Sequence, residues 1–353
     1  MGSFFSLFRG ETKKIWSKKS AWVMIVILSG IMALMALLFG AMGSLGEDVV
    51  RSFNQSSLVG QLNSLTGMEI TGDLYLEQAE ENLPALKEQV EQAREEMEAS
   101  TGIERYANFI AYNSMEREYQ VMAYQVEHQI APERMAASWG YIQLAEQLAI
   151  SIIILLVLII GAGSVASEYA DGTIKLLFPR PYRRWKILLA KFLATLGYGI
   201  VLLVIGYALS LLSGGILYGF ENAGTVVVRT NGIAAYQTTA LGQSLIFYLP
   251  GAVGILLTLA MAGMISCLFR SRAAAVGVTL LVYLVSGTVA GLLAMFGAEW
   301  VKYTVFFNMD LSVYLQRGAM VPGMNIVFSG AAMGLYTIVF LVIAFLSFCK
   351  RDV

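Results

Sequence analysis

Charged residues are scarce in this chain, and the residues that build disulfides and many metal centres are almost absent. Asp, Glu, Lys and Arg make up 14% of the 353 residues, whereas soluble proteins average about 25%. Cys267 and Cys349 fall at the ends of apolar runs, so we expect buried apolar thiols rather than a structural disulfide. The single histidine, His128, has no Cys or second His at ligand spacing, so no metal site is predicted.

The common catalytic motifs are also missing from the sequence. It has no phosphate-binding G-x-x-x-x-G-K-[ST] loop, no H-E-x-x-H zinc motif and no set of residues for a Ser-His-Asp triad. We therefore expect no enzyme activity, no catalytic residue and no cofactor in this chain, and nothing indicates a nucleic-acid partner. The chain therefore cannot hydrolyse ATP by means of such a phosphate-binding loop.

The chain does contain long apolar runs. Apolar residues make up 57% of it, and runs of about 20 uncharged apolar residues are long enough to cross a hydrocarbon core of about 30 Å. In lipid such runs must be helical, because no solvent is present to pair with the backbone. The sequence predicts six spans: Ala21–Gly43, Leu148–Ser167, Ile187–Tyr218, Ile246–Phe269, Ala273–Gly297 and Ile326–Phe348.

Charge is divided unevenly between the two sides of these spans. Residues 44–146 carry 18 of the 25 acidic residues and 6 of the 24 basic ones. The short segments on one side carry 15 Lys and Arg, against 3 on the other. By the positive-inside rule both termini are cytoplasmic and residues 44–146 are extracytoplasmic, which fits a multi-pass protein of a bacterial plasma membrane.

Residues 1–20 are predicted to form a cytoplasmic helix that lies on the membrane surface before the first span, residues 21–43. Aromatic residues such as Phe4, Phe8 and Trp16 recur at roughly helical spacing, and four lysines accompany them, which suits contact with membrane lipids. The alternative is a basic tail that only fixes the topology.

Residues 44–146 are predicted to form an extracytoplasmic helical domain that resembles a coiled coil. Apolar residues from Leu76 to Met97 repeat every seven positions, with Pro84 as a possible kink, and a second seam runs from Tyr112 to Val126. An antiparallel helical hairpin fits this pattern. Its Glu-rich face is either simply solvated or a surface for a cationic peptide or partner protein.

Two shorter segments on the same side have weaker signals. Residues 226–230 and 233–237 flank Asn231-Gly232, which suits a two-residue β-hairpin turn. Residues 298–325 are amphipathic and broken by Pro322 and Gly323, so short re-entrant or interfacial helices are expected there. The fold class is therefore an all-α membrane protein of six spans, with residues 147–353 carrying spans two to six.

The most ordered stretch without an apolar run follows the second span, at residues 168–192, and contains the predicted loop 168–186. It combines a glutamate, a Gly-Thr pair, a Leu pair, two prolines and a basic cluster. Lys191 falls about one turn into the next span, where its long stem can snorkel to the interface. No ionisable residue is expected at mid-depth in any span, which argues against an ion-coupled carrier.

The stretch resembles the cytoplasmic loop after the second span in permease subunits of type-2 ABC transporters, closely here and loosely over the whole chain. The matching positions are Glu168, Gly172, Thr173, Leu176, Leu177, Pro181, Arg184 and Lys191. Arg183 stands where that family usually has Ser or Thr.

The resemblance implies a dimeric permease coupled to separate ATPase subunits and exporting a substrate. It assigns coupling to Glu168, Gly172, Thr173, Pro181, Arg183, Arg184 and Lys191. The large domain between the first two spans is similar to that of permeases for sodium, peptide antibiotics or lipid-like substrates. The alternatives are a peptide-sensing signalling or immunity module, an ion-coupled carrier, and an ordinary loop whose basic residues only set the topology.

Overall fold

The computed structural model describes residues 4–43, 73–131, 137–173, 183–220, 223–269, 271–296 and 299–350. Six of its helices are long and apolar enough to span a membrane, which confirms the predicted number. They are α2 (Lys19–Met42), α7 (Ala137–Ala170), α9 (Arg184–Tyr218), α10 (Ala240–Leu268), α11 (Arg272–Met295) and α13 (Ile326–Lys350). The chain is thus a largely helical, multi-pass membrane protein.

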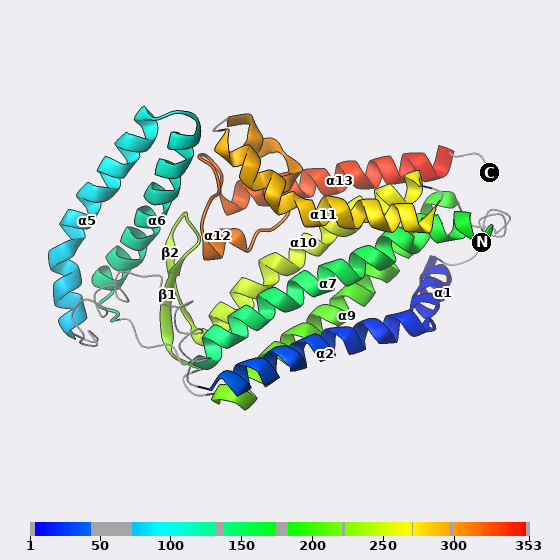
Figure 1. Cartoon of the computed structure of the whole chain (residues 1–353), viewed down its shortest axis with the longest axis horizontal. Coiled ribbons are helices and arrows are strands. Elements are labelled where there is room, and N and C mark those ends of the chain that lie inside the picture. Colours follow the sequence, from blue (N-terminus) through cyan, green and yellow to red (C-terminus); the bar gives the residue numbers. More distant parts are fainter. Residues whose placement is uncertain are drawn as a thin grey trace.

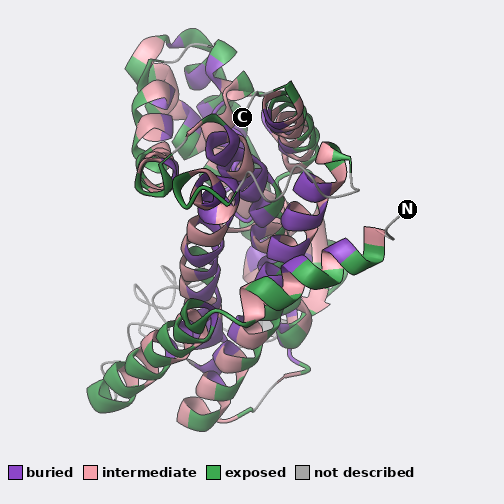
Figure 2. Cartoon of the chain, turned by 90° about the vertical axis from the view of Figure 1, so that its right-hand side faces the viewer, coloured by how far each residue is buried: buried purple, intermediate pink, exposed green. Residues whose placement is uncertain are grey.

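The bundle is built around α7 and α10, which are mostly buried, whereas α2, α11 and α13 bury only a small share of their surface. Both chain ends lie at one end of the bundle, called here the terminal end, and the hairpin α5–α6 lies beyond the opposite end, the hairpin end (Figure 1). Figure 2, viewed from the terminal end, shows the buried residues gathered on the inner helices. Helices with exposed apolar faces at the rim are what lipid contact requires.

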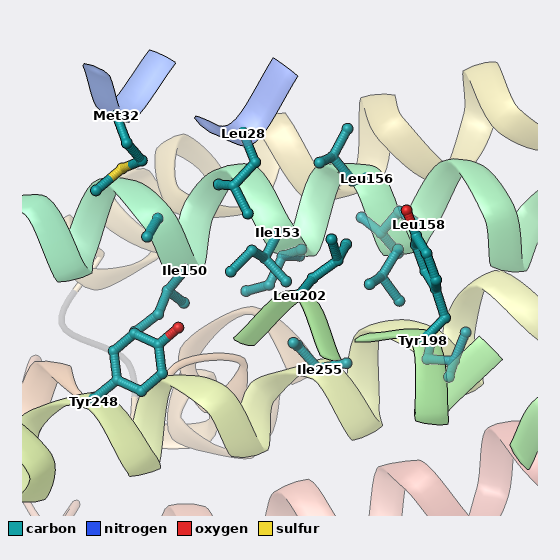
Figure 3. Close-up of a cluster of buried hydrophobic side chains, with 14 of the residues drawn as sticks. Leu28, Met32, Ile150, Ile153, Leu156, Leu158, Tyr198, Leu202, Tyr248 and Ile255 are labelled. Carbon is teal, nitrogen blue, oxygen red and sulfur yellow. The ribbon is translucent and has the colours of Figure 1, made fainter. Parts of the chain in front are cut away.

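The core of the bundle lies where α2, α7, α9 and α10 meet. Leu28, Ile153, Leu202 and Ile255, one from each helix, are fully or almost fully buried in one cluster (Figure 3). Gly206 of α9 allows this approach, because a Cβ atom there would lie 2.8 Å from the Cδ1 atom of Ile153. Small residues at such crossings let membrane helices pack at close range.

Residues 73–131 contain the predicted helical hairpin, formed by α5 (Asp73–Ala99) and α6 (Gly102–Glu127). Leu76, Ala79 and Leu86 of α5 are buried with Met122 of α6, so the seven-residue repeat does form the seam. Pro84 lies inside α5 without ending it. Residues 44–72, also assigned to this domain, lie outside the described residues.

A two-stranded antiparallel sheet, β1 (Val226–Thr230) and β2 (Ala235–Thr239), precedes α10. The first strand is where the sequence predicts it, but the second begins two residues later. Asn231 explains the shift, because its side-chain oxygen accepts hydrogen bonds from the backbone N–H groups of Ile233 and Ala234. This caps a four-residue turn in place of the expected two-residue turn.

The connection between α11 and α13 contains short helical pieces. They are the 3₁₀-helices η1 (Glu299–Tyr303) and η2 (Val305–Asn308) and the single turn α12 (Val313–Gln316). Phe307 and Tyr314 are buried against α11 and α13. The expectation of short helices in residues 298–325 is confirmed.

Candidate functional site

The 168–192 stretch begins on the last turn of α7 and ends on the second turn of α9, at the terminal end of the bundle (Figure 1). Residues 174–182 lie outside the described residues, and with them Pro181 and the Leu176-Leu177 pair. The remaining predicted coupling residues, apart from the half-buried Arg184, fall into two groups. Glu168 and Lys191 are buried, while Gly172, Thr173 and Arg183 are exposed.

Glu168 and Lys191 form the centre of a buried ion cluster. The Lys191 Nζ atom lies 2.6 Å from Glu168 Oε1 and 3.0 Å from Glu11 Oε2. Lys14 Nζ is also 2.6 Å from Glu168 Oε1. The cluster therefore contains two carboxylates and two ammonium groups, and it joins helices α1 (Phe4–Trp16), α7 and α9.

The position of Lys191 corrects the expectation that its side chain snorkels to the interface. The side chain is 4% exposed and points to the two carboxylates. The expectation failed because the sequence shows no spatial partner for a lysine one turn into a span. The two carboxylates lie at hydrogen-bond distance from the ammonium group. They offset the loss of hydration that otherwise drives a lysine toward water.

Glu11 is a residue of this site that the sequence reasoning missed. It lies on the buried face of α1, one turn after Leu7, which is also buried. Its signal in the sequence is that it is the only acidic residue among the first 20, within a basic segment. A lone acid in such a segment suggests a specific ammonium partner, although the sequence does not identify Lys191 as that partner.

Helix α1 is attached to the bundle by more than the ion cluster. Leu7 packs with Val165, Ile187 and Phe348, which belong to α7, α9 and α13. The ring of Trp16 meets that of Tyr198 edge to face, with centroids 5.3 Å apart. Phe5, expected on the apolar face, is 70% exposed and is left for contact with lipid. α1 is therefore a packed part of the bundle as well as an amphipathic helix.

The exposed group flanks the ion cluster along the chain, with Gly172 and Thr173 just after α7 and Arg183 just before α9, and is called here the polar corner. Gly172 has a φ of +70°, a conformation that favours glycine, and the Thr173 hydroxyl lies 3.4 Å from the Glu168 carbonyl oxygen. Arg184 donates a 3.1 Å hydrogen bond to the Cys349 carbonyl at the end of α13. Partial burial, with the nearby positive charges of Lys14 and Arg272, holds the pKa of Lys18 below its usual value.

A second polar contact joins the hairpin to the rest of the chain. The Arg117 guanidinium of α6 donates to the carbonyl oxygens of Tyr314 at 2.8 Å, Leu315 at 3.1 Å and Thr230 at 3.3 Å. Asn113, one turn earlier, donates to the Arg317 carbonyl at 2.9 Å. Burial lowers the pKa of Arg117, with a smaller contribution from the positive charge of Arg229. The hairpin is thus docked onto the α11–α13 connection and the β-hairpin.

The structure also corrects the start of the second span and the assignment of Glu146. Helix α7 begins at Ala137, well before the predicted Leu148, so Glu146 lies within the bundle helix rather than in the preceding domain. Its side chain is fully buried. Apolar-run counting stops at any charged residue and therefore began the span too late. Glu146 lies near the hairpin end of α7 and not at mid-depth, so the expectation that no ionisable residue lies at mid-depth in a span stays a prediction.

The family model described as "Protein of unknown function (DUF2705)" matches residues 105–353. Among curated proteins, the uncharacterized protein YhcI of Bacillus subtilis (strain 168) is 34% identical over 232 residues, which cover 65% of this chain and 74% of that relative. The uncharacterized membrane protein YdbK of the same organism is 31% identical over 201 residues, which cover 56% of this chain and 76% of that relative.

Proposed function

The chain belongs to the DUF2705 family, and from the geometry at its terminal end we propose that it is the permease subunit of an ATP-driven ABC exporter. The observation that carries the proposal is the ion cluster of Glu11, Lys14, Glu168 and Lys191. It fixes both ends of the 168–192 stretch and α1 to one another. The ABC-permease resemblance of that stretch supports the same function.

The cluster gives the stretch the stiffness that a coupling element needs. Glu168 is on α7 and Lys191 is on α9, so a force applied to the residues between them reaches both helices at once. α7 packs against α9 and α10 along its length, so a displacement of its end moves the bundle core. A flexible loop between independent helices would absorb such a force instead.

The exposed corner is the surface that meets the ATPase. Gly172, Thr173 and Arg183 are open to solvent, and the basic residues around them suit acidic side chains of a soluble partner. Glu168 and Lys191 do not touch the partner in this arrangement. They are positioning residues that hold the corner in place, so their part in coupling is indirect.

The proposed assembly contains two permease subunits and two ATPase subunits. The ATPases bind ATP and Mg²⁺ and lie on the cytoplasmic side of a bacterial plasma membrane, with both permease termini. Their closure pushes the 168–192 stretches, and the spans of the two permeases shift between access states. The hairpin α5–α6 is then extracytoplasmic, and membrane lipids surround α2, α11 and α13.

The test begins with a spanless P-loop ATPase, for which the neighbouring reading frames are the first place to look. Co-purification with this chain and substrate-stimulated ATP hydrolysis in vesicles are the expected results. Gly172→Trp should weaken binding or uncouple hydrolysis from export, because it places a large side chain on the exposed corner at a φ that favours glycine.

Gly102→Trp is the matched control. Gly102 also has a positive φ, +62°, and a Cβ atom added there would meet no other atom within 4 Å, but it lies at the hairpin turn. It should leave ATPase binding unchanged. Normal binding and export by Gly172→Trp would show that the corner is only a connector, and export without any ATPase would sink the whole proposal.

The docked hairpin favours one second candidate, a peptide-sensing signalling or immunity module with little net transport. Arg117 and Asn113 connect the hairpin to the segment that leads into α13, which is a direct route from an extracytoplasmic ligand to the spans. Vesicle transport separates the two functions. A signalling module would bind the ATPase but move no substrate.

A further inference from the structure

Glu146 is a fully buried carboxyl group at the hairpin end of α7. Its Oε1 atom accepts a hydrogen bond from the Ser244 hydroxyl of α10. Its Oε2 atom has no hydrogen-bond partner among the described residues. The group plays no part in the ion cluster, because Glu168 lies 22 residues further along the same helix, about 33 Å away.

Among the residues that the structure describes, the groups that face Glu146 are neutral. The Ser244 hydroxyl lies 3.4 Å from the Tyr207 hydroxyl of α9, and the Tyr207 and Tyr248 rings are 5.1 Å apart. The Tyr248 hydroxyl donates to the Leu203 carbonyl at 2.8 Å, so it is already used. These two phenols are the titratable groups facing the carboxyl, and no ion pair of the described residues includes Glu146.

The two buried carboxyls of α7 make an internal comparison. Glu168 has two ammonium groups at 2.6 Å, which compensate a negative charge. Glu146 has one hydroxyl donor and an unpaired oxygen. Burial of an ionised carboxylate without a cation is far more costly than burial of the neutral acid, so a carboxyl in the second setting keeps its proton.

We propose that Glu146 is a proton-binding site, and that the bound proton holds α7 against α10 at the hairpin end of the bundle. The neutral acid fits the closed contact with Ser244. When these helices separate and water enters, the carboxyl releases its proton to that water and becomes a hydrated carboxylate. Proton binding and closure at this end are therefore linked, whatever supplies the energy for transport.

Infrared spectroscopy of the purified full chain in lipid nanodiscs tests the site directly. At neutral pH the wild type should show the carbonyl band of a protonated carboxylic acid, and Glu146→Gln should lose it. Glu127→Gln, which removes an exposed carboxyl at the end of α6, should keep it. Ser244→Ala keeps the acid but removes its hydrogen bond, so the band should shift to higher frequency. A spectrum unchanged by both Glu146→Gln and Ser244→Ala would overturn the proposal.

The pH dependence of unfolding is the second measurement. The folded chain holds a proton that the unfolded chain gives up once the pH exceeds the range in which an exposed Glu ionises. The folded-to-unfolded ratio of the wild type, relative to Glu146→Gln, should therefore fall by up to about tenfold per pH unit above that range. Glu127→Gln should keep the wild-type slope. Equal slopes for the wild type and Glu146→Gln would mean that Glu146 carries no proton in the folded state.

Discussion

Glu168 Oε1 and Lys191 Nζ lie 2.6 Å apart, although 23 positions separate the two residues in the chain. The residues between them include the whole connection from α7 to α9. The pair therefore closes the base of that connection, and Glu11 ties α1 to the same point. While the ion pair is intact, a movement of the connection therefore moves α1, α7 and α9 together.

The first prediction concerns this pair. Lys191→Met keeps much of the length of the side chain but leaves Glu168 and Glu11 with one ammonium fewer in a buried site. Breaking a buried ion pair by removing one partner costs about 3–5 kcal/mol. We expect a loss of that order in the free energy of unfolding, measured on the purified chain in detergent.

Two further variants show whether the loss comes from the ion pair. Lys13→Met, an exposed position on α1, should change stability little. Adding Glu168→Gln to Lys191→Met should recover part of the loss, because it removes the uncompensated charge. Additive effects of Lys191→Met and Glu168→Gln would contradict the coupling between them.

The general fold could be predicted from the sequence because its signals are local. Runs of apolar residues predict the six helices, and the seven-residue repeat from Leu76 to Met97 predicts the α5 seam. The start of α7 could not be predicted in this way, because Glu146 ends the apolar run while its burial depends on Ser244 far along the chain.

The site was predictable only in part, for the same reason. The order of residues from Glu168 to Lys191 marked the stretch as important, and both end residues belong to the observed cluster. That they pair with each other, and that Lys191 also pairs with Glu11 of α1, depends on how three helices pack. A single sequence contains no measure of that packing, so Glu11 was missed and Lys191 was expected at the surface.

The second prediction concerns the docking of the hairpin. Arg117→Ala removes a charged donor that contacts three backbone carbonyls, of Tyr314, Leu315 and Thr230. Hydrogen bonds to charged groups are worth about 1.5–3 kcal/mol. We expect backbone amides of residues 313–319 to exchange with deuterium about tenfold faster or more, measured by mass spectrometry.

Arg117→Lys should accelerate the exchange of the same amides almost as much, because an ammonium group cannot reach several carbonyls as the guanidinium fork does. Arg94→Ala is the matched control, since Arg94 is exposed and pairs with Glu98 one turn away on the same helix. Unchanged exchange in Arg117→Ala would mean that the hairpin is held in place by other contacts.

The third prediction is a pH dependence in the hairpin. The buried Tyr75 hydroxyl donates to Gln125 Oε1 at 2.9 Å, and burial, with the nearby negative charge of Glu118, raises the pKa of Tyr75 to about 12. The pKa of tyrosine in an unfolded chain is about 10. Between these values the folded hairpin binds more protons than the unfolded chain, so stability falls as pH rises from about 10 to about 12.

A soluble fragment of residues 70–135 is the material for this test, with helicity followed by circular dichroism. The fragment should be mainly helical at neutral pH, and Leu86→Asp should reduce the helicity by placing a charge in the seam. Between pH 10 and pH 12 the wild-type fragment should lose about 2–3 kcal/mol of its free energy of unfolding through Tyr75, and Tyr75→Phe should abolish that part of the loss. The same pH profile in both chains would refute the role of Tyr75.

The last prediction fixes the orientation on which the ATPase proposal depends. The excess of basic residues in the short segments at the terminal end, 15 against 3, predicts that this end is cytoplasmic. Thr101, exposed in the turn between α5 and α6, and Ser17, exposed after α1, report on the two sides. With Cys267 and Cys349 changed to Ala, Thr101→Cys should react with a membrane-impermeant thiol reagent in intact cells. Ser17→Cys should react only after the membrane is permeabilised. The reverse pattern would put the 168–192 stretch outside the cell, away from any ATP, and would exclude the proposed coupling.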